Sequence, residues 1–410
     1  MITSLYPKSD FEFDPGTCWL MHCAEGPVPK VSIAALESFL SKEAKPWNKQ
    51  FDVDFVELTN ETRREAARTM GFHHADISLT ATTSAGLVLV AQGLSWHHGD
   101  EILVPVGEFP SNIWPWKALE SSGVSVRMVP LWPGHCGGQN ALETAPPPAD
   151  CDPETALIGA IGPKTRLMAV SWVRFQDGLK LNLERLASAC KEQNVELVVD
   201  GIQGAGTAAG FSDRVPDGIS AFASGAHKGL LSPQGSGFLW TSESFRQKLK
   251  PLGSWLSVED ALNFQRPNSD VNREWNSDGT YLEQGVPNQL GCIGFRAALT
   301  YINNANGDQK AHRGQAHIRS VQKKLLNVLK DQPGWTEEAN RLLNLLHKDR
   351  LGSVLSFFKG NLNTSVDALL KDGFERGLYA SVREGYLRLA LHGWHDESDL
   401  NPIVDWLTKG

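Results

Sequence analysis

Strand-length apolar runs alternate with helix-length amphipathic segments through the first half of this chain, and this alternation constrains the fold more than any other feature. Several of the runs are apolar throughout, as expected of strands that are covered on both faces. We expect strands at 101–106, 125–131, 166–173, 195–200, 219–223 and 237–241. Helices are expected at 84–94, 112–121 and 182–193. This order is typical of an α/β sheet with helices on both sides.

The pattern changes after about residue 288. Long helical segments precede a shorter α+β stretch, with expected elements at 288–303, 312–331, 355–358 and 386–391. A chain of 410 residues is long enough for two or three domains. We therefore expect a large α/β domain over 16–287 and a small α+β domain formed by 1–15 and 288–410. The Gly- and Pro-rich segment 132–153 is expected to be an exposed excursion.

Composition excludes several classes of partner. Lys and Arg number 39 against 47 Asp and Glu, a net charge of −8, and no basic run is present, so we expect no binding to nucleic acid or to an anionic membrane. The longest apolar run, 85–94, is far too short to span a bilayer. No secretory signal opens the sequence. The six scattered cysteines lack zinc-like spacing, which predicts reduced thiols in a cytoplasmic protein.

The residues around one lysine indicate a role in cofactor binding. Lys228, in FASGAHKGLLSPQGSGFLW, lies between a short apolar run and a Gly- and Pro-containing turn. Upstream, Asp200 ends the apolar run VELVVD and Gln203 follows it. Ligands of open α/β sheets bind at the carboxyl ends of the strands. Pyridoxal phosphate (PLP) needs a lysine amine for its Schiff base and a carboxylate that keeps its pyridine nitrogen protonated. An isolated lysine is usually solvated, but this combination favours a PLP site.

A candidate phosphate site lies earlier in the chain. In TATTSAGLVLVAQGL, Thr82, Thr83 and Ser84 stand at the start of an apolar helix. Free N–H groups and hydroxyls at a helix N-terminus form a natural site for an anion. Alone, such a cluster is more often only a helix cap. Together with Lys228 and Asp200, it completes a cofactor site.

Four motifs bring a family resemblance. ATTSAG, EFPSNIWPW, VVDGIQGAG and SGAHKGLLSPQGSGF resemble, in order and spacing, the superfamily of class V aminotransferases and cysteine desulfurases. The resemblance runs from about Trp19 to the C-terminus and includes LEQGVPNQLGCIGF and VREGYLRLALHGW. It implies the fold type I of PLP-dependent enzymes, with a mostly parallel seven-stranded sheet in the large domain, a smaller α+β C-terminal domain, an amino-acid substrate and a homodimer.

The resemblance also implies roles for single residues. Lys228 would carry the cofactor as a Schiff base and move the proton at the substrate α-carbon. Asp200 would pair with the pyridine nitrogen and Gln203 with the phenolic oxygen. The residues that would hold the phosphate are Thr82, Thr83, His227 and Ser224. Phe109, in EFPSN, falls where the family stacks an aromatic ring on the cofactor.

Arg388 is the first candidate for substrate binding. In YLRLAL the leucines at 387, 389 and 391 share one strand face, so Arg388 points to the other. A guanidinium can bind a carboxylate through two hydrogen bonds, which a lysine cannot do. The resemblance puts the family's carboxylate-binding arginine here, although a solvated strand arginine remains the alternative. Arg383, in VREG, is a second candidate.

Several positions depart from the desulfurase pattern. The desulfurases' catalytic cysteine lies in a loop shortly before that arginine, whereas SVREGYLR is short and lacks cysteine, so persulfide chemistry is not expected. Phe109 replaces a histidine, and a phenyl ring cannot move protons. Phe175 replaces an asparagine that often contacts the cofactor oxygen. Val286 replaces a threonine that in many relatives reaches the partner subunit's phosphate.

Other motifs are expected to have no catalytic or binding role. Residues 204–209 formally match a dinucleotide fingerprint, but glycine and proline interrupt the helix that should follow. The histidine pairs 73–74 and 97–98 are adjacent, so neither pair shares one face of a helix or strand, and we expect no metal site. Cys23, in a stretch that approaches the substrate in relatives, is expected to be a buried small residue.

We therefore expect a PLP-dependent enzyme that acts at the α-carbon of an amino acid. Transamination is favoured, because the desulfurase cysteine and histidine are both absent. A β-lyase acting on a sulfur-containing amino acid is the alternative, and an epimerase or cyclase of specialised metabolism is a third outcome. A non-catalytic binding module is disfavoured, since loss of catalysis would release Lys228 from selection first, and Lys228, Asp200 and Gln203 are intact.

Overall fold

The computed structural model of the chain describes residues 2–135, 145–211, 214–307, 310–362 and 365–409. Its centre is a seven-stranded sheet in the order β2-β8-β7-β6-β5-β3-β4. In that order the strands are β2 (Ile77–Thr80), β8 (Gly237–Thr241), β7 (Ile219–Gly225), β6 (Glu196–Asp200), β5 (Thr165–Ser171), β3 (Glu101–Pro105) and β4 (Ser125–Val129). β8 runs antiparallel to β2 and β7, and the remaining pairs are parallel. The predicted α/β class with its mostly parallel sheet is confirmed.

Side chains alternate along the central strands between two hydrophobic cores. On β6, Leu197 and Val199 belong to one core and Val198 to the other. On β5, the same division separates Met168 from Ala169. Because successive residues of a strand face opposite sides, the sheet is buried on both faces, as its continuous apolar runs predict.

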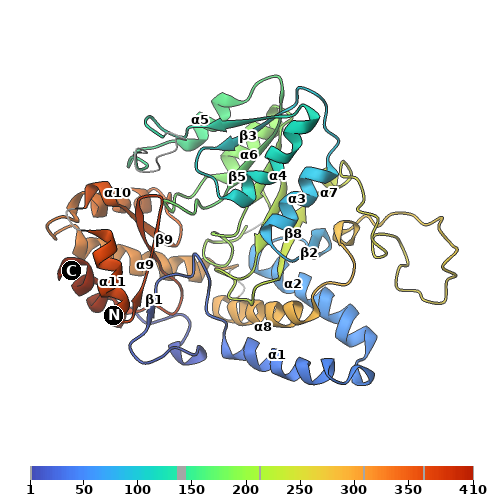
Figure 1. Cartoon of the computed structure of the whole chain (residues 1–410), viewed down its shortest axis with the longest axis horizontal. Helices are drawn as coiled ribbons and strands as arrows, with labels where there is room; N and C mark the ends of the chain where they lie inside the picture. Colours follow the sequence, from blue (N-terminus) through green and yellow to red (C-terminus); the bar gives the residue numbers. More distant parts are fainter. Residues whose placement is uncertain (1, 136–144, 212–213, 308–309, 363–364, 410) are drawn as a thin grey trace.

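Helices cover both faces of this sheet (Figure 1). The core that contains Val198 also contains side chains of α3 (Thr83–Gly93), α4 (Trp114–Lys117) and α7 (Glu243–Arg246). The opposite core contains side chains of α2 (Leu58–Met70), α5 (Pro153–Ala160), α6 (Leu183–Glu192) and α8 (Gln289–Asn306). Helix α1 (Lys30–Glu43) lies along α8, where Phe39 and Ile293 share a small core.

The predicted strands are confirmed to within two residues at each end. The helices predicted at 84–94 and 182–193 are confirmed as α3 and α6, and the side chain of Asn182 caps α6 by accepting a hydrogen bond from the Arg185 N–H. The helix predicted over 112–121 is wrong, because only Trp114–Lys117 is α-helical and 3₁₀ turns flank it. A proline fits the first turn of a helix but not its interior. Pro115 is therefore compatible with a helix that begins at Trp114 but not with one that begins at 112 and continues past it.

The C-terminal part forms a second, three-stranded antiparallel sheet in the order β11-β12-β9. Its strands are β9 (Val354–Phe358), β11 (Ser381–Arg383) and β12 (Tyr386–Ala390), and its helices are α9 (His312–Leu329), α10 (Thr336–His347), α11 (Val366–Glu375) and α12 (Glu397–Lys409). The N-terminal segment joins this part, since β1 (Cys18–Trp19) pairs with β10 (Leu378–Tyr379). The division into 16–287 and 1–15 with 288–410 stays a prediction.

Two further predictions can be compared with the structure, one on the segment 132–153 and one on membrane-spanning helices. The exposed excursion predicted over 132–153 is wrong at its start, because Trp132 and His135 are buried and stack with their ring centroids 3.9 Å apart. Its part over 136–144 lies outside the described residues. Among the described helices, none combines the length and the apolar character that a membrane crossing needs.

Candidate functional site

A cavity of about 360 Å³ lies at the carboxyl ends of β5 and β6, between the sheet and the β11–β12 hairpin. Almost all residues singled out from the sequence line it, namely Thr82, Thr83, Phe109, Asp200, Gln203, His227, Lys228, Arg383 and Arg388. Ser224 does not belong to this lining. It is buried on β7, and its hydroxyl donates a hydrogen bond to the Gly225 carbonyl, so its phosphate role stays a prediction that the cavity does not support.

Asp200 ends β6 at the floor of the cavity and is buried. Its Oδ1 accepts a hydrogen bond of 3.0 Å from the Ile202 N–H. The pKa of Asp200 is raised to about 7, mainly by burial and also by the Glu108 carboxylate, while the hydrogen bond from Ile202 and the charge of Lys228 oppose the shift. A cation placed against Asp200 would therefore stabilise the ionised carboxylate, because an opposite charge lowers a carboxyl pKa.

Lys228 is also buried, and its Nζ lies 5.5 Å from the centre of the Phe109 ring. Burial lowers the pKa of this amine, and the charge of Asp200 opposes the shift. A lowered pKa increases the fraction of neutral amine, which is the form that attacks a carbonyl or accepts a proton. The N-terminal segment packs directly on this lysine, since the Gly26 N–H donates to the His227 carbonyl. A Cβ at Gly26 would lie 2.3 Å from the Lys228 carbonyl oxygen, so glycine is required there.

Gln203 carries unused hydrogen-bonding capacity. Its Nε2 donates a 2.9 Å bond to the carbonyl of Cys23, while its buried Oε1 has no partner among the described residues. An amide nitrogen carries two hydrogens, so a second donor also remains. Unsatisfied buried polar atoms are costly, and this one is explained if a polar ligand fills the cavity.

The start of α3 offers several donors to an anion. Thr82 is the N-cap, and its hydroxyl accepts the Ala85 N–H at 3.0 Å. The Thr83 hydroxyl accepts the Gly225 N–H at 2.7 Å and so ties α3 to β7. Both hydroxyls keep their own hydrogen for donation, and the first N–H groups of the helix have no intrahelical acceptor. His227 lines the same cavity with a pKa lowered by burial, so its imidazole is a neutral donor at this end of the site.

Arg388 lies on β12 with only 3% of its surface exposed. Its Nη1 donates a 2.6 Å bond to the Phe175 carbonyl and its Nη2 a 3.0 Å bond to the Ser381 hydroxyl. Its buried Nε has no partner among the described residues. The guanidinium is therefore held by the protein and still presents donors to the cavity. The alternative of a solvated strand arginine is wrong for this residue.

Aromatic and small side chains complete the walls. Phe109, 40% exposed, meets Phe175 edge to face with ring centroids 5.1 Å apart. Phe109 thus presents a ring to the cavity, as a stacking residue must. Cys23 is buried in the opposite wall, as predicted.

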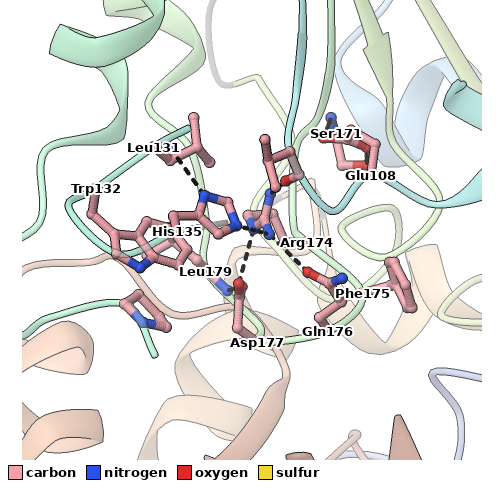
Figure 2. Close-up of polar contacts among 12 residues, drawn as sticks. Glu108, Leu131, Trp132, His135, Ser171, Arg174, Phe175, Gln176, Asp177 and Leu179 are labelled. Carbon is pink, nitrogen blue, oxygen red and sulfur yellow. Dashed lines mark hydrogen bonds and ion pairs between the residues drawn. The ribbon is translucent and has the colours of Figure 1, made fainter. Parts of the chain in front are cut away.

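Sequence reasoning missed the buried polar network beneath these walls (Figure 2). Arg174, fully buried, donates to Asp177 at 2.9 Å, to the Val106 carbonyl at 2.9 Å and to Gln176 at 2.8 Å. These bonds fix the loop that follows β5, and this loop carries the Phe175 carbonyl that receives Arg388. The available signal was WVRFQDG, a charged stretch that directly follows a strand ending at the same sheet edge.

A second missed residue is Glu108, buried beside Asp200. Its Oε1 accepts the Ser171 N–H at 2.9 Å, and its Oε2 accepts from the Ser171 hydroxyl and from Asn112. Burial raises the pKa of Glu108, while the charge of Arg174 lowers it. The charge of Glu108 thus acts through space on Asp200 and is itself balanced by Arg174, which Figure 2 shows nearby.

Comparison with known proteins places the chain among relatives. The sequence profile of the family described as aminotransferase class-V matches residues 18–369. An uncharacterized aminotransferase of Schizosaccharomyces pombe is 24% identical over 85% of this chain and 81% of its own length. A cysteine desulfurase of Salmonella dublin is 26% identical over 67% of this chain, and the match spans 64% of that relative.

A solved structure, a mutant of C-DES with glycine covalently linked to its PLP cofactor, superposes with a TM-score of 0.79. It is 20% identical and covers 98% of this chain and 99% of its own. At this identity the likeness concerns the fold alone.

Proposed function

This chain belongs to the aminotransferase class-V family and is a PLP-dependent enzyme, and we propose that it transfers the amino group of an amino acid to a 2-oxo acid. The observation that carries the proposal is the convergence of Lys228, Asp200, Gln203 and Arg388 on one cavity. These residues come from strands, loops and a hairpin far apart in the sequence. Their side chains combine an amine, a carboxylate, an amide and a guanidinium around one small space.

The residues of the cavity fit PLP. Asp200 is a buried carboxylate for the pyridinium nitrogen, and the second Nε2 hydrogen of Gln203 would donate to the phenolic oxygen. The phosphate would meet Thr82, Thr83 and His227 at the start of α3. When bound, PLP supplies an electron sink for the bonds at the substrate α-carbon. The ring would lie against Phe109.

The chain's own residues then perform three tasks. Arg388 binds the substrate α-carboxylate through its free Nε and its remaining Nη hydrogens. Lys228, whose pKa is lowered by burial, accepts the α-proton and, with PLP bound, would return it to the C4′ carbon of the cofactor. Phe109 and Phe175 exclude water from the face above the amine, which strengthens the electrostatic contacts inside the cavity.

Transamination is proposed first because two positions of the cavity lack the groups that a desulfurase pattern expects there. Phe109 cannot transfer a proton, and the hairpin 381–388 contains no cysteine. A β-elimination from a sulfur-containing amino acid is the second candidate. It is favoured by one observation, the likeness in fold to C-DES, which is described as a cystine C-S lyase.

The deciding experiment is turnover by the PLP-loaded protein with a panel of amino acids, with and without a 2-oxo acid. Amino-group transfer that requires the 2-oxo acid supports transamination. Release of ammonia and pyruvate from cysteine or cystine without a 2-oxo acid would replace it with β-elimination. Protein that shows no change of cofactor absorbance with any amino acid would contradict both.

We also propose that the chain acts as a homodimer. Large apolar side chains are exposed on the segment 253–287, part of which projects from the body of the molecule in Figure 1, namely Trp255, Phe264, Val271, Trp275 and Val286. Exposed apolar groups on a projecting segment are typical of an interface between subunits. Sedimentation at micromolar concentration tests the proposal, and a monomer would contradict it. The cytoplasmic location stays a prediction.

A further inference from the structure

Two arginines share one face of the β11–β12 hairpin. The strands pair antiparallel, with Ser381 opposite Arg388 and Arg383 opposite Tyr386. Residues two apart on a strand face the same side, so Arg383 and Arg388 are diagonal neighbours on the face that lines the cavity. Diagonal neighbours lie about 7–8 Å apart at Cα. One short substrate could therefore contact both guanidiniums.

The two arginines differ in how the protein holds them. Arg388 is buried and bonded to the Phe175 carbonyl and to Ser381. Arg383 is exposed at the mouth of the cavity and forms no ion pair with any residue that the structure describes. Two of the hydrogen-bond donor atoms of Arg388 are thus already bonded within the protein. Arg383 keeps its donors for a ligand.

The carboxylate of Glu384, the residue next to Arg383, is bonded to a residue other than Arg383. Glu384 occupies the hairpin turn with a left-handed backbone, φ 46°, and is followed by Gly385 at φ 83°. Its carboxylate accepts a hydrogen bond from Gln176, in the loop that Arg174 organises (Figure 2). Glu384 still acts on both arginines through space, because their charges lower its pKa against the larger effect of burial. It is therefore a partial counter-charge rather than a partner of Arg383.

The charge inside the cavity favours an anion at its mouth. Asp200 is the acidic residue of the lining, and it lies at the floor, where the cofactor's pyridinium would compensate it. Lys228, Arg388 and Arg383 are the basic residues of the same lining. The charge of Arg383 also lowers the pKa of Arg388, behind the larger effect of burial, so the two guanidiniums are close enough to interact. An α-carboxylate on Arg388 leaves Arg383 without a counter-ion of its own.

We propose that Arg383 binds a second anionic group of the substrate, so that the enzyme selects amino acids with an acidic side chain or a second carboxylate. This inference rests on the proposed function, because it assumes that the substrate's α-carboxylate occupies Arg388. Arg383 would then set specificity, and chemistry at the α-carbon would remain the task of Lys228.

The test is calorimetric binding of two matched probes to the PLP-loaded protein. Glutarate carries two carboxylates, and its monoamide, glutaramate, carries one carboxylate and one neutral amide of the same shape. We expect glutarate to bind about tenfold tighter, since a hydrogen bond to a charged group contributes about 1.5–3 kcal/mol. The Arg383→Gln variant should lose this preference while its affinity for glutaramate stays unchanged. Unchanged glutaramate affinity and cofactor absorbance also show that the variant is folded.

Two further variants sharpen the test. Glu384→Gln removes the partial counter-charge, so its preference for glutarate should exceed that of the wild type. Arg376→Gln is the matched control, because Arg376 is an exposed arginine that pairs with Asp372 on α11, outside the cavity. It should leave both affinities unchanged.

Equal affinities for the two probes, or a preference that survives Arg383→Gln, would overturn the proposal. No measurable binding of glutarate would do the same. Failure of the proposed function is seen separately, because probe binding needs no turnover. If glutarate selectivity depends on Arg383 but no amino acid exchanges its amino group, the anion site stands and the transamination proposal falls. If amino groups are exchanged without any selectivity for the second anion, the anion site alone falls.

Discussion

The two halves of the cavity are built in different ways. The sheet half, with Asp200, Lys228 and the start of α3, is positioned by neighbouring strands of one buried sheet. The hairpin half, with Arg383 and Arg388, lies on a second sheet, and side-chain bonds between distant segments join it to the loop after β5, among them the bonds of Arg388 to the Phe175 carbonyl and of Gln176 to Glu384. The comparison teaches that the proposed cofactor residues are placed by the ends of neighbouring strands and by the start of a helix, whereas the proposed substrate residues depend on side chains that bridge distant segments. Substitutions in each half should therefore separate cofactor effects from substrate effects.

The largest effect is expected in the sheet half, from Lys228→Ala. Removal of the amine eliminates the proposed acid–base group at the substrate α-carbon, so turnover should fall by about 10²–10⁴-fold. Steady-state kinetics measure this loss, and the absorbance spectrum measures retention of the cofactor. Lys191→Ala is the control, because Lys191 is an exposed lysine paired with Asp217, and it should keep full activity. A Lys228→Ala protein with near-normal turnover would remove this residue from the mechanism.

The next largest effect is expected at the joint between the halves, from Arg174→Met. It leaves the buried carboxylate of Asp177 without its partner, which costs about 3 kcal/mol in the free energy of unfolding. The Phe175 carbonyl should also shift, which raises KM for the amino acid more than it weakens cofactor binding. Urea unfolding and kinetics measure the two effects.

Arg185→Met is the matched control for that variant, since Arg185 forms an exposed ion pair with Asp152. Its change in the free energy of unfolding should be under about 1 kcal/mol. Equal destabilisation by the two substitutions would contradict a special role for the buried network.

A third effect, in the hairpin half, is expected from Arg388→Gln. Loss of a buried charge that pairs with a carboxylate costs about 2–3 kcal/mol of binding, so KM should rise about a hundredfold. Affinity for PLP should not change. Ser381→Ala removes only the hydroxyl that orients Nη2, and KM should rise by only severalfold. If Arg388→Gln instead weakened PLP binding, the division between the two halves would be wrong.

The smallest effect at neutral pH is expected on stability. It comes from buried histidines at the junction where the N-terminal segment meets the C-terminal part. Burial lowers the pKa of His22 well below its usual value, that of His392 to about 3 and that of His395 to about 4. These histidines stay neutral when folded but take up protons when unfolded, near pH 6.5. Stability should therefore be constant above pH 7 and fall as the pH drops below about 6.5, by about 1 kcal/mol per histidine at pH 6.

Thermal unfolding measured between pH 8 and pH 5 checks this dependence. His73→Asn should leave it unchanged, because His73 is exposed. A melting temperature that is flat down to pH 5 would show that the buried histidines do not control stability.

Much of the sheet half could be predicted from the sequence. Asp200 ends a continuous apolar run, and such a run is a strand covered on both faces whose carboxyl end meets its neighbours at one edge. Thr82 precedes an apolar helix that begins as predicted. Lys228 and Gln203 were singled out from their context, the resemblance added their roles, and the structure brings both to the same cavity. Local periodicity placed Asp200 and Thr82 because the sheet itself brings strand ends together.

The hairpin half could be predicted only as a set of candidates. The alternation in YLRLAL gave the face of Arg388 but not its burial. Its bond to Phe175 joins residues 213 positions apart. A contact over that distance in sequence cannot be predicted from a local pattern. Glu108, Arg174 and His135 were missed for the same reason, since each reads as an ordinary surface residue until the loops pack together.

The sequence by itself determined the α/β sheet, the strand edge at which the cavity forms and the chemistry of its floor, because strand periodicity and strand ends are local properties of the chain. Only the tertiary structure decided that Arg388 is buried and tethered, that Glu384 turns toward Gln176, and that Arg383 remains available at the mouth. Those features depend on which distant loops meet, and the free energy of packing, not the order of residues in one segment, selects that meeting.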